Sequence, residues 1–180
     1  MISKQTIKFI SSLKHSKYRL KYNCFVAEGP HLVSEFINSK FKIHSIYATQ
    51  AFVDKNQFNN ISIVSQRELS RISSLKNPSN ILAVIYRPNY KLEINKVMQH
   101  KKIILLDSIS DPGNLGSIIR TADWFGVNSI YVSMECVDVF NPKVVQATMG
   151  SLSRVRVIKV DLALMLNKIK NNNIICYGAS

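Results

Sequence analysis

The segment best equipped to do chemistry runs from Asp107 to Gly126 and reads DSISDPGNLGSIIRTADWFG. It gathers carboxylates, hydroxyls, a carboxamide and one arginine around the turn formers Pro112 and Gly113, and the apolar run 103–106 precedes it. Such a run is typical of a parallel strand covered on both faces, which proline and glycine then end. The pattern predicts a loop at the carboxyl edge of a sheet, where open α/β sheets bind their ligands.

Apolar residues recur at helical spacing after this loop and predict a helix over 115–125. Asn114 is the expected N-cap of that helix, and Gly126 supplies a left-handed stop at its end. Arg120 lies between apolar neighbours, so we expect its side chain to face inward, toward the site.

The Arg120 guanidinium stays charged at any physiological pH. We therefore expect it to stabilise a developing negative charge, or to hold a phosphate, rather than to remove a proton. The structural alternative is an ion pair with Asp123, one turn along the helix, or with Asp107.

A second polar constellation covers residues 141–157 and reads NPKVVQATMGSLSRVRV. Asn141 can cap a helix that begins at Pro142, where proline is best tolerated, and Gly150 can end it. Hydroxyl and guanidinium groups then gather at the mouth of the next strand, on Ser151, Ser153, Arg154 and Arg156. Taken alone, this stretch also fits a solvated connection.

The net charge narrows the choice of partner. Lysine and arginine number 24 against 11 aspartate and glutamate residues, which gives a formal charge of +13. Such an excess favours a polyanionic partner, with nucleic acid ahead of an anionic membrane surface. Biased codon usage, which enriches Ile, Lys and Asn, is the alternative explanation. No apolar run approaches the ~20 residues that cross a bilayer, and we expect a cytoplasmic protein.

The chain has three cysteines, Cys24, Cys136 and Cys176. They are too few and too far apart for a disulfide framework or a CxxC metal site, so we expect reduced thiols and no metal.

The amino-terminal stretch is basic and amphipathic. Six lysines and arginines precede the first acidic residue, Glu28, with apolar residues between them. A transit peptide would favour arginine over lysine and would end in a cleavage-like break, whereas this stretch runs directly into residues 25–27. We therefore expect it to be folded structure.

Strand-like and helix-like segments alternate along the chain, which predicts an α/β fold. In the first unit the expected strands are 24–27, 43–48, 61–65 and 81–86, and the expected helices are 31–38 and 66–73. In the second unit the expected strands are 103–107, 130–133, 155–160 and 174–177, and the expected helices are 115–125, 142–149 and 162–170. Helices between strands imply right-handed crossovers and a parallel sheet. A polar stretch separates the units, so we expect domains at 1–88 and 101–180 and a linker at 89–100.

Both constellations resemble the signature motifs of the SpoU/TrmH (SPOUT) family, the knotted methyltransferases that move a methyl group from S-adenosylmethionine to a ribose 2′-oxygen in RNA. The first motif is matched by Asn114, Gly116, Arg120, Thr121 and Ala122. The second is matched by Pro142, Lys143, Val144, Val145, Ala147, Met149, Gly150 and Ser151. The amino-terminal unit is similar to the family's accessory domain at Lys17, Tyr18, Arg19, Phe25, Val26, Glu28, Gly29, Leu32, Val33, Ala83 and Val84.

This resemblance implies a small ribosomal-protein-like α/β substrate-binding domain followed by an α/β-knot methyltransferase domain with a parallel sheet. It also implies S-adenosylmethionine as cofactor, rRNA or tRNA as substrate, and a homodimer formed through the knot region. In the family, the arginine that matches Arg120 activates the hydroxyl, and Asn114 would position it. The expected RNA contacts are Lys17, Arg19, Lys21, Arg154 and Arg156.

One departure from the family concerns the cofactor. In relatives a third motif, which supplies most of the cofactor pocket, follows the strand expected here at 174–177, and this sequence stops at Ser180. We therefore expect an incomplete methyltransferase domain in which Gly178 is the assigned cofactor contact. A smaller departure is Gln146, where relatives often carry a basic residue.

Two other functions stay open. One is an inactive RNA-binding remnant that cannot hold the cofactor. The other is a generic nucleotide-binding α/β protein, suggested by the glycine-containing loop 111–116, although neither G-x-x-x-x-G-K-[ST] nor a full G-x-G-x-x-G is present. The sequence does not identify the RNA or the nucleotide that would be modified.

Overall fold

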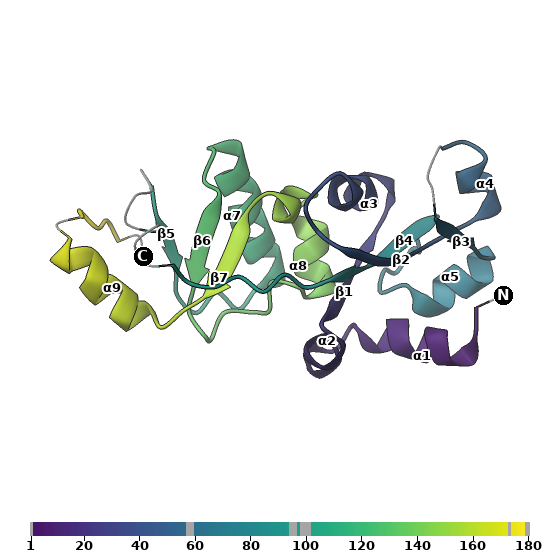
Figure 1. The fold of residues 1–180 in the computed structure, drawn as a ribbon, viewed down its shortest axis with the longest axis horizontal. Helices are drawn as coiled ribbons and strands as arrows, with labels where there is room; N and C mark the ends of the chain where they lie inside the picture. Colours follow the sequence, from purple (N-terminus) through teal and green to yellow (C-terminus); the bar gives the residue numbers. More distant parts are fainter. Residues whose placement is uncertain (1, 57–59, 94–96, 98–101, 173, 179–180) are drawn as a thin grey trace.

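The amino-terminal unit is built on a mixed four-stranded sheet with the strand order β1-β4-β2-β3 (Figure 1). A computed structural model describes residues 2–56, 60–93, 97, 102–172 and 174–178 of the chain. The strands are β1 (Cys24–Glu28), β2 (Ile43–Ala48), β3 (Ile61–Ile63) and β4 (Ile81–Tyr86). β4 runs antiparallel to both β1 and β2, and β3 runs parallel to β2. The predicted strands are therefore present, with the third one shorter than expected.

Helices cover both faces of this sheet, because successive side chains of a strand point to opposite faces. The helices are α1 (Lys4–Ser12), α2 (Ser16–Tyr22), α3 (Pro30–Ile37), α4 (Gln50–Val53) and α5 (Gln66–Ile72). In β1, Cys24 and Val26 pack with residues of α1 and α5, whereas Phe25 and Ala27 pack with residues of α3. The basic amino-terminal stretch is thus folded, as two helices.

The second unit contains a parallel three-stranded sheet with the order β5-β6-β7, as the crossover pattern predicts. Its elements are β5 (Ile104–Leu106), α7 (Pro112–Trp124), β6 (Ser129–Val132), α8 (Pro142–Ala147), the 3-10 turn η1 (Ser151–Ser153), β7 (Arg156–Lys159) and α9 (Leu162–Asn171). Residues of α7 and α8 pack on one face of the sheet, and Met165 and Ile169 of α9 pack on the other with Tyr131.

Two expectations about this sheet are wrong. Residues 174–177 form no strand, and the side chains of Ile175 and Tyr177 are 75% and 91% exposed. A strand requires a ladder of backbone hydrogen bonds, but the N–H of Ile174 instead donates back to the carbonyl oxygen of Ile169 in α9 (3.3 Å). The apolar residues of β5 are half-buried instead of covered on both faces, because β5 lies at the edge of the sheet.

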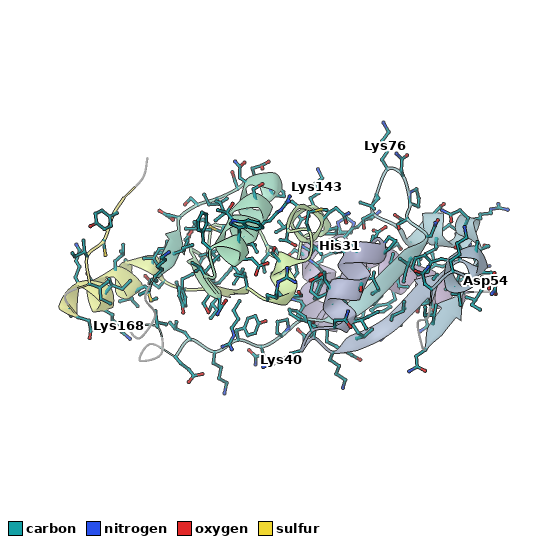
Figure 2. All side chains as sticks on the ribbon, turned by 90° about the horizontal axis from the view of Figure 1, so that it is seen from above. His31, Lys40, Asp54, Lys76, Lys143 and Lys168 are labelled. Atoms are coloured by element: carbon teal, nitrogen blue, oxygen red, sulfur yellow. The ribbon has the colours of Figure 1, made fainter. Side chains whose placement is uncertain are left out.

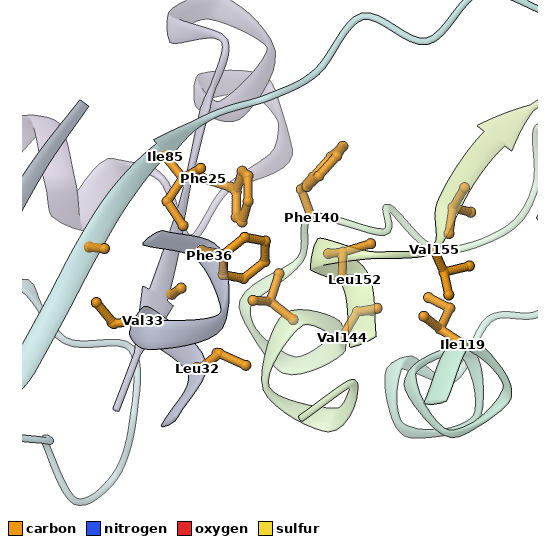
Figure 3. Packing of buried hydrophobic residues seen from close by; sticks show 14 of the residues in the cluster. Phe25, Leu32, Val33, Phe36, Ile85, Ile119, Phe140, Val144, Leu152 and Val155 are labelled. Atoms are coloured by element: carbon orange, nitrogen blue, oxygen red, sulfur yellow. The ribbon is translucent and has the colours of Figure 1, made fainter. Parts of the chain in front are cut away.

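The two units share one hydrophobic core. Phe25 and Phe36 of the first unit meet Phe140 and Leu152 of the second (Figure 3). The ring centroids of Phe25 and Phe140 are 4.7 Å apart. We call the cluster of these four residues and their buried neighbours the shared core. Because each unit buries part of its apolar surface against the other, the chain behaves as a single packed body despite its two sheets.

None of the helices formed by the described residues combines the length and the hydropathy that a membrane span requires.

The motif glycine Gly116 permits the close approach of α7 and α8. A Cβ added there would lie 2.4 Å from the Cβ of Ala147 and 3.1 Å from the carbonyl oxygen of Val144. We predict that Gly116→Ala lowers the free energy of unfolding by about 2 kcal/mol, the usual cost of overpacking. Urea denaturation measures this, and Ala147→Gly introduced into the same chain should recover part of the loss.

The matched control is Ser117→Ala on the exposed side of α7, which we expect to change stability little. Alanine normally stabilises a helix by up to ~1 kcal/mol relative to glycine. A Gly116→Ala variant that is more stable than the wild type would therefore contradict the close-packing argument.

Candidate active site and RNA-binding surface

Two loops meet at the carboxyl edge of the parallel sheet. Ser108, after β5, donates its backbone N–H to the hydroxyl of Ser133, after β6, over 2.9 Å. Ile109 donates its N–H to the sulfur of Cys136 (3.3 Å) and accepts a hydrogen bond from the N–H of Val137 (2.9 Å). These bonds lock the predicted site loop against its neighbour, so the start of α7 has a fixed position.

Lys159, the last residue of β7, closes the same edge. Its ammonium group donates to the carbonyl oxygens of Met134 and Cys136, each over 2.8 Å. No sequence pattern predicts this role of Lys159, because its partners are backbone atoms of a loop more than twenty residues away. The Lys159 charge is therefore engaged in holding the loop after β6.

The N-cap of α7 is Asp111, which corrects the prediction of Asn114. A carboxylate oxygen of Asp111 accepts the backbone N–H of Asn114 over 2.7 Å, and Pro112 occupies the first helical position. Both residue types cap helices well, and the chain enters the helix three residues before Asn114. The Asn114 side chain is consequently exposed and makes no hydrogen bond among the described residues, so its carboxamide is available to a ligand. The predicted stop is confirmed, since Gly126 has a φ of 69°.

Arg120 is exposed, which corrects the expectation that it faces inward. The buried stripe of α7 is formed by Leu115, Gly116, Ile119 and Ala122. Each residue turns the helix by about 100°, which carries Arg120 away from that stripe and to the solvent side. The alternative of an ion pair with Asp123 or Asp107 is also wrong, because in the described part of the chain neither carboxylate contacts the Arg120 guanidinium.

Asn114 and Arg120 do not converge within one chain. Six residues of α-helix separate them, which corresponds to about 9 Å along the axis and to positions roughly 120° apart around it. Trp124 lies one turn beyond Arg120, and its side chain is 87% exposed. The solvent side of α7 therefore presents an unneutralised guanidinium next to a large aromatic ring.

The Asp123 carboxylate forms an ion pair with Arg154. Arg154 Nη2 and Nε donate to one Asp123 carboxylate oxygen over 2.8 and 3.0 Å, and Arg154 Nη1 contacts Glu35 of α3 in the first unit. Burial alone would raise the pKa of Asp123, but hydrogen bonds from Arg154 and from Ser151 outweigh it and lower that pKa. A Cβ at Gly150 would lie 2.6 Å from the Cγ of Glu35, so glycine is required for this approach.

Arg19 also holds the units together, which corrects its assignment as an RNA contact. Its side chain is 2% exposed, and its Nη2 and Nε lie 2.7 and 2.8 Å from the Asp138 carboxylate in the loop after β6. Its Nη1 donates to the carbonyl oxygens of Leu13 and Lys14 over 2.8 and 2.9 Å. A guanidinium with all these partners in a buried position has no face left for a phosphate.

Arg156 lies at the amino edge of the parallel sheet, at the start of β7, and so does the adjacent Arg154. Their predicted position at the mouth of this strand is confirmed, and the first constellation lies at the opposite edge of the sheet. Arg156 lines a groove of about 1060 Å³ between the two units, which we call the interdomain groove. Its guanidinium carbon is 5.9 Å from the centroid of the Tyr90 ring.

Basic side chains of the first unit line the same interdomain groove. They are Lys40, Lys42 and Arg87, and Figure 2 shows Lys40 beside the segment that joins the two units. The labelled Lys76 and Lys143 project from other parts of the surface in the same view, so positive charge is spread along the molecule.

Lys17 and Lys21 are exposed on α2, where the sequence predicts RNA contacts. Their ammonium nitrogens lie 5.0 and 5.4 Å from the ring centroids of Tyr18 and Tyr22, respectively. Both rings line a groove of about 660 Å³ between α1 and α2, which we call the α1–α2 groove.

A cavity of about 690 Å³ lies between β5, α9 and the segment after α9. Leu105, Leu166 and Tyr177 give it apolar walls, and Asp107 adds a carboxylate at the carboxyl end of β5. Its volume is in the range that binds cofactors, and its apolar wall suits an adenosyl group. The charged residues of the lining are Asp107 and Lys102. Gly178 is exposed beside Tyr177 and is not part of the wall. In the described residues no group of His, Cys, Asp and Glu side chains could hold a metal ion.

The parallel sheet with ordered loops at its carboxyl edge, joined to a mixed-sheet unit, defines a two-unit α/β protein. Two family models match the chain. The model of the SpoU rRNA Methylase family matches residues 101–180, and that of the MRM3-like substrate binding domain matches residues 4–83.

Curated relatives match along most of the chain. The 23S rRNA (guanosine(2553)-2'-O)-methyltransferase RlmP of Bacillus subtilis is 30% identical over 179 residues, which cover 98% of this chain and 70% of that protein. The mitochondrial rRNA methyltransferase 3 of Homo sapiens is 30% identical over 156 residues, which cover 81% of this chain and 37% of the human protein. This chain belongs to the SpoU/TrmH family of methyltransferases.

Solved structures agree with this assignment. A TrmH-family protein from Porphyromonas gingivalis matches with a TM-score of 0.83 at 32% identity, over 97% of this chain and 69% of that one. An AdoMet-bound rRNA methyltransferase from Sinorhizobium meliloti matches with a TM-score of 0.80 at 26% identity, over 96% and 67%. Both the substrate-binding fold and the parallel-sheet fold predicted from the sequence are therefore confirmed.

Because Arg19 is buried between two units, its loss should destabilise the whole molecule. We predict that Arg19→Met lowers the free energy of unfolding by about 3 kcal/mol, since the Asp138 carboxylate and two carbonyl groups lose their partner. Urea denaturation of the full chain measures this change. Lys17→Met, the same kind of substitution at an exposed position of α2, should stay within about 0.5 kcal/mol of the wild type. Equal effects of the two substitutions would contradict the structural role of Arg19.

Proposed function

We propose that this protein transfers a methyl group from S-adenosylmethionine to a ribose 2′-hydroxyl of rRNA or tRNA. The observation that carries the proposal is the 30% identity to a 23S rRNA 2′-O-methyltransferase, which extends through both the substrate-binding unit and the methyltransferase unit. A cofactor-bound relative with a TM-score of 0.80 supports the choice of methyl donor.

The reaction requires help with charge at the attacking oxygen. A ribose hydroxyl is a poor nucleophile at neutral pH, and its oxygen becomes negatively charged as its proton leaves to water. That charge would be lost when the oxygen takes the methyl group and the electrons of the broken carbon–sulfur bond stay on a neutral thioether. When bound, S-adenosylmethionine supplies a methyl group on a positively charged sulfur. Arg120 would stabilise the oxygen, or hold the phosphate next to it, and Asn114 would orient the ribose through its exposed carboxamide.

The arrangement of charges on α7 favours this role for Arg120. Arg154 occupies the Asp123 carboxylate, which is the acid closest to Arg120 along the helix, so the positive charge of Arg120 is not cancelled from its own helix. The ring of Trp124, one helical turn beyond Arg120, is exposed, and so is the ring of Phe125. We propose that a second copy of the chain covers this part of the surface and completes the site, which would explain why Asn114 and Arg120 do not meet within one copy.

We place the cofactor in the cavity at the carboxyl end of β5, with Asp107 facing its positive charge. Gly178 remains our proposed backbone contact at the rim, because it follows Tyr177 and a Cβ there would meet no atom within 4 Å. RNA would be held by Lys17 and Lys21 and, in the interdomain groove, by Arg156. We propose a cytoplasmic location, where such RNA is found.

The test is a methyl-transfer assay on ribosomal RNA with Arg120→Ala. We predict that the rate of methyl transfer falls by about 100-fold or more, as for the loss of one charge-stabilising group. The affinity for RNA and the affinity for S-adenosylmethionine, measured by calorimetry, should each change less than twofold. The matched control is Arg67→Ala, an exposed arginine on α5, which should leave all three quantities unchanged.

The other functions predict different results. If the wild type binds RNA but neither binds S-adenosylmethionine in calorimetry nor transfers methyl groups, the chain is an inactive RNA-binding protein. If Arg120→Ala weakens RNA affinity as strongly as it slows transfer, then Arg120 binds RNA and has no separate role in the chemistry.

A further inference from the structure

We propose that the α1–α2 groove binds an unpaired nucleotide of the RNA, with its base stacked on the Tyr18 and Tyr22 rings and its phosphates held by the lysines around them. The inference rests on the proposed function in one respect, that the substrate is RNA. It adds where the RNA binds and which conformation of the RNA is selected.

The groove is lined by two aromatic rings that are held in place, that of Tyr18 half-buried and that of Tyr22 exposed. The rings of Tyr18 and Tyr22, one helical turn apart, are nearly parallel, with an interplanar angle of 13° and centroids 6.2 Å apart. Phe9 of α1 packs its ring against Tyr22 nearly at right angles, with centroids 5.0 Å apart. Tyr22 nevertheless remains 39% exposed. The two tyrosines already stack on each other, so a base would stack on an outer ring face, where it would displace the lysine ammonium group that lies over that ring.

The charge around these rings suits a phosphate backbone. Lys8 and Lys14 line the groove, and Lys17 and Lys21 place their ammonium groups over the tyrosine rings. Among the described residues, no acidic side chain lines this groove. The first carboxylate of the chain, Glu28, is buried in β1, where it accepts hydrogen bonds from Ser73 and Ser74. Nothing on the groove wall offsets the lysines.

The buried Arg19 fixes the groove relative to the methyltransferase unit. It belongs to α2, it bonds to the carbonyl groups at the end of α1, and it pairs with Asp138 in the loop after β6. Figure 1 shows α1 and α2 together along the lower edge of the molecule. RNA held in the groove is thereby kept close to the loops at the carboxyl edge of the parallel sheet.

Rings and lysines together select unpaired RNA. In a duplex the base faces are covered by their neighbours, so lysines could still meet phosphates but the tyrosines would have no partner. In a single strand the base face is free, and stacking on an aromatic ring contributes about 1–3 kcal/mol per base. An acidic protein segment would pair its carboxylates with the lysines, as a duplex pairs its phosphates, but it would not stack on the tyrosine rings.

The experiment compares two RNAs on the full chain by fluorescence anisotropy. One is a labelled 12-nucleotide single strand of mixed sequence, and the other is the same strand annealed to its complement. We expect the Tyr18→Ala/Tyr22→Ala variant to bind the single strand at least tenfold more weakly, and the duplex within twofold of the wild type. The matched control Tyr18→Phe/Tyr22→Phe keeps both rings and should bind both RNAs like the wild type. Thermal unfolding verifies that both variants are folded.

Several results would overturn the proposal. Equal loss for the two RNAs would show that the alanine variant merely weakens electrostatic contacts. Unchanged affinity for the single strand would show that the groove is not used. Failure of the phenylalanine variant to bind normally would indicate hydrogen bonding by the hydroxyls in place of stacking. A further result is that polyglutamate displaces the single strand equally well from the wild type and from the alanine variant. That result would indicate a site for acidic protein.

The proposed function is tested separately on the same samples. Methyl transfer and S-adenosylmethionine binding are measured for the wild type and both variants. One outcome is that the wild type transfers no methyl group but prefers the single strand, and that the alanine variant loses this preference. In that case the proposed function fails and the groove assignment stands. If transfer is normal and single-strand affinity does not change, the groove assignment fails and the proposed function stands.

Discussion

A buried arginine connects the two halves of this protein, and most of the other features depend on that connection. Arg19 bonds to Asp138 through Nε and Nη2 and to the carbonyl groups that end α1 through Nη1, in a position that is 2% exposed. A charge removed from water to this extent is tolerated when it is paired and hydrogen-bonded. The ion pair lies beside the shared core, in which Phe25 and Phe140 are in contact. Apolar burial therefore supplies the attraction between the units, and the ion pair fixes their orientation.

The same orientation determines which charges are free for a ligand. Arg154 bridges Asp123 and Glu35, so two carboxylates at the interface are neutralised and Arg120 is left without a counter-ion on its own helix. Gly116 and Gly150 have no side chain where two elements approach most closely, and for this reason both motifs contain glycine. The motif residues thus divide into those that allow close packing and those, Asn114 and Arg120, that reach solvent.

Much of the fold follows from local patterns in the sequence. The strands at 43–48 and 81–86 have the predicted bounds, and Asn141 caps its helix with Pro142 in the first position, because these features depend on neighbouring residues alone. The roles of Arg19 and Arg154 could not be predicted, since each pairs with a carboxylate 119 residues away and a basic residue looks the same whether it meets an acid or a phosphate. The face on which Arg120 lies was misjudged because apolar neighbours in sequence do not imply burial when the helix turns by about 100° per residue. The segment 174–177 has the composition of a strand, but a strand also requires a partner.

The claim that the two units form a single body is tested most directly by scanning calorimetry of the full chain. A shared core with a buried ion pair predicts one unfolding transition, in which the calorimetric enthalpy equals the van't Hoff enthalpy. Two separable transitions, one for each sheet, would contradict the account.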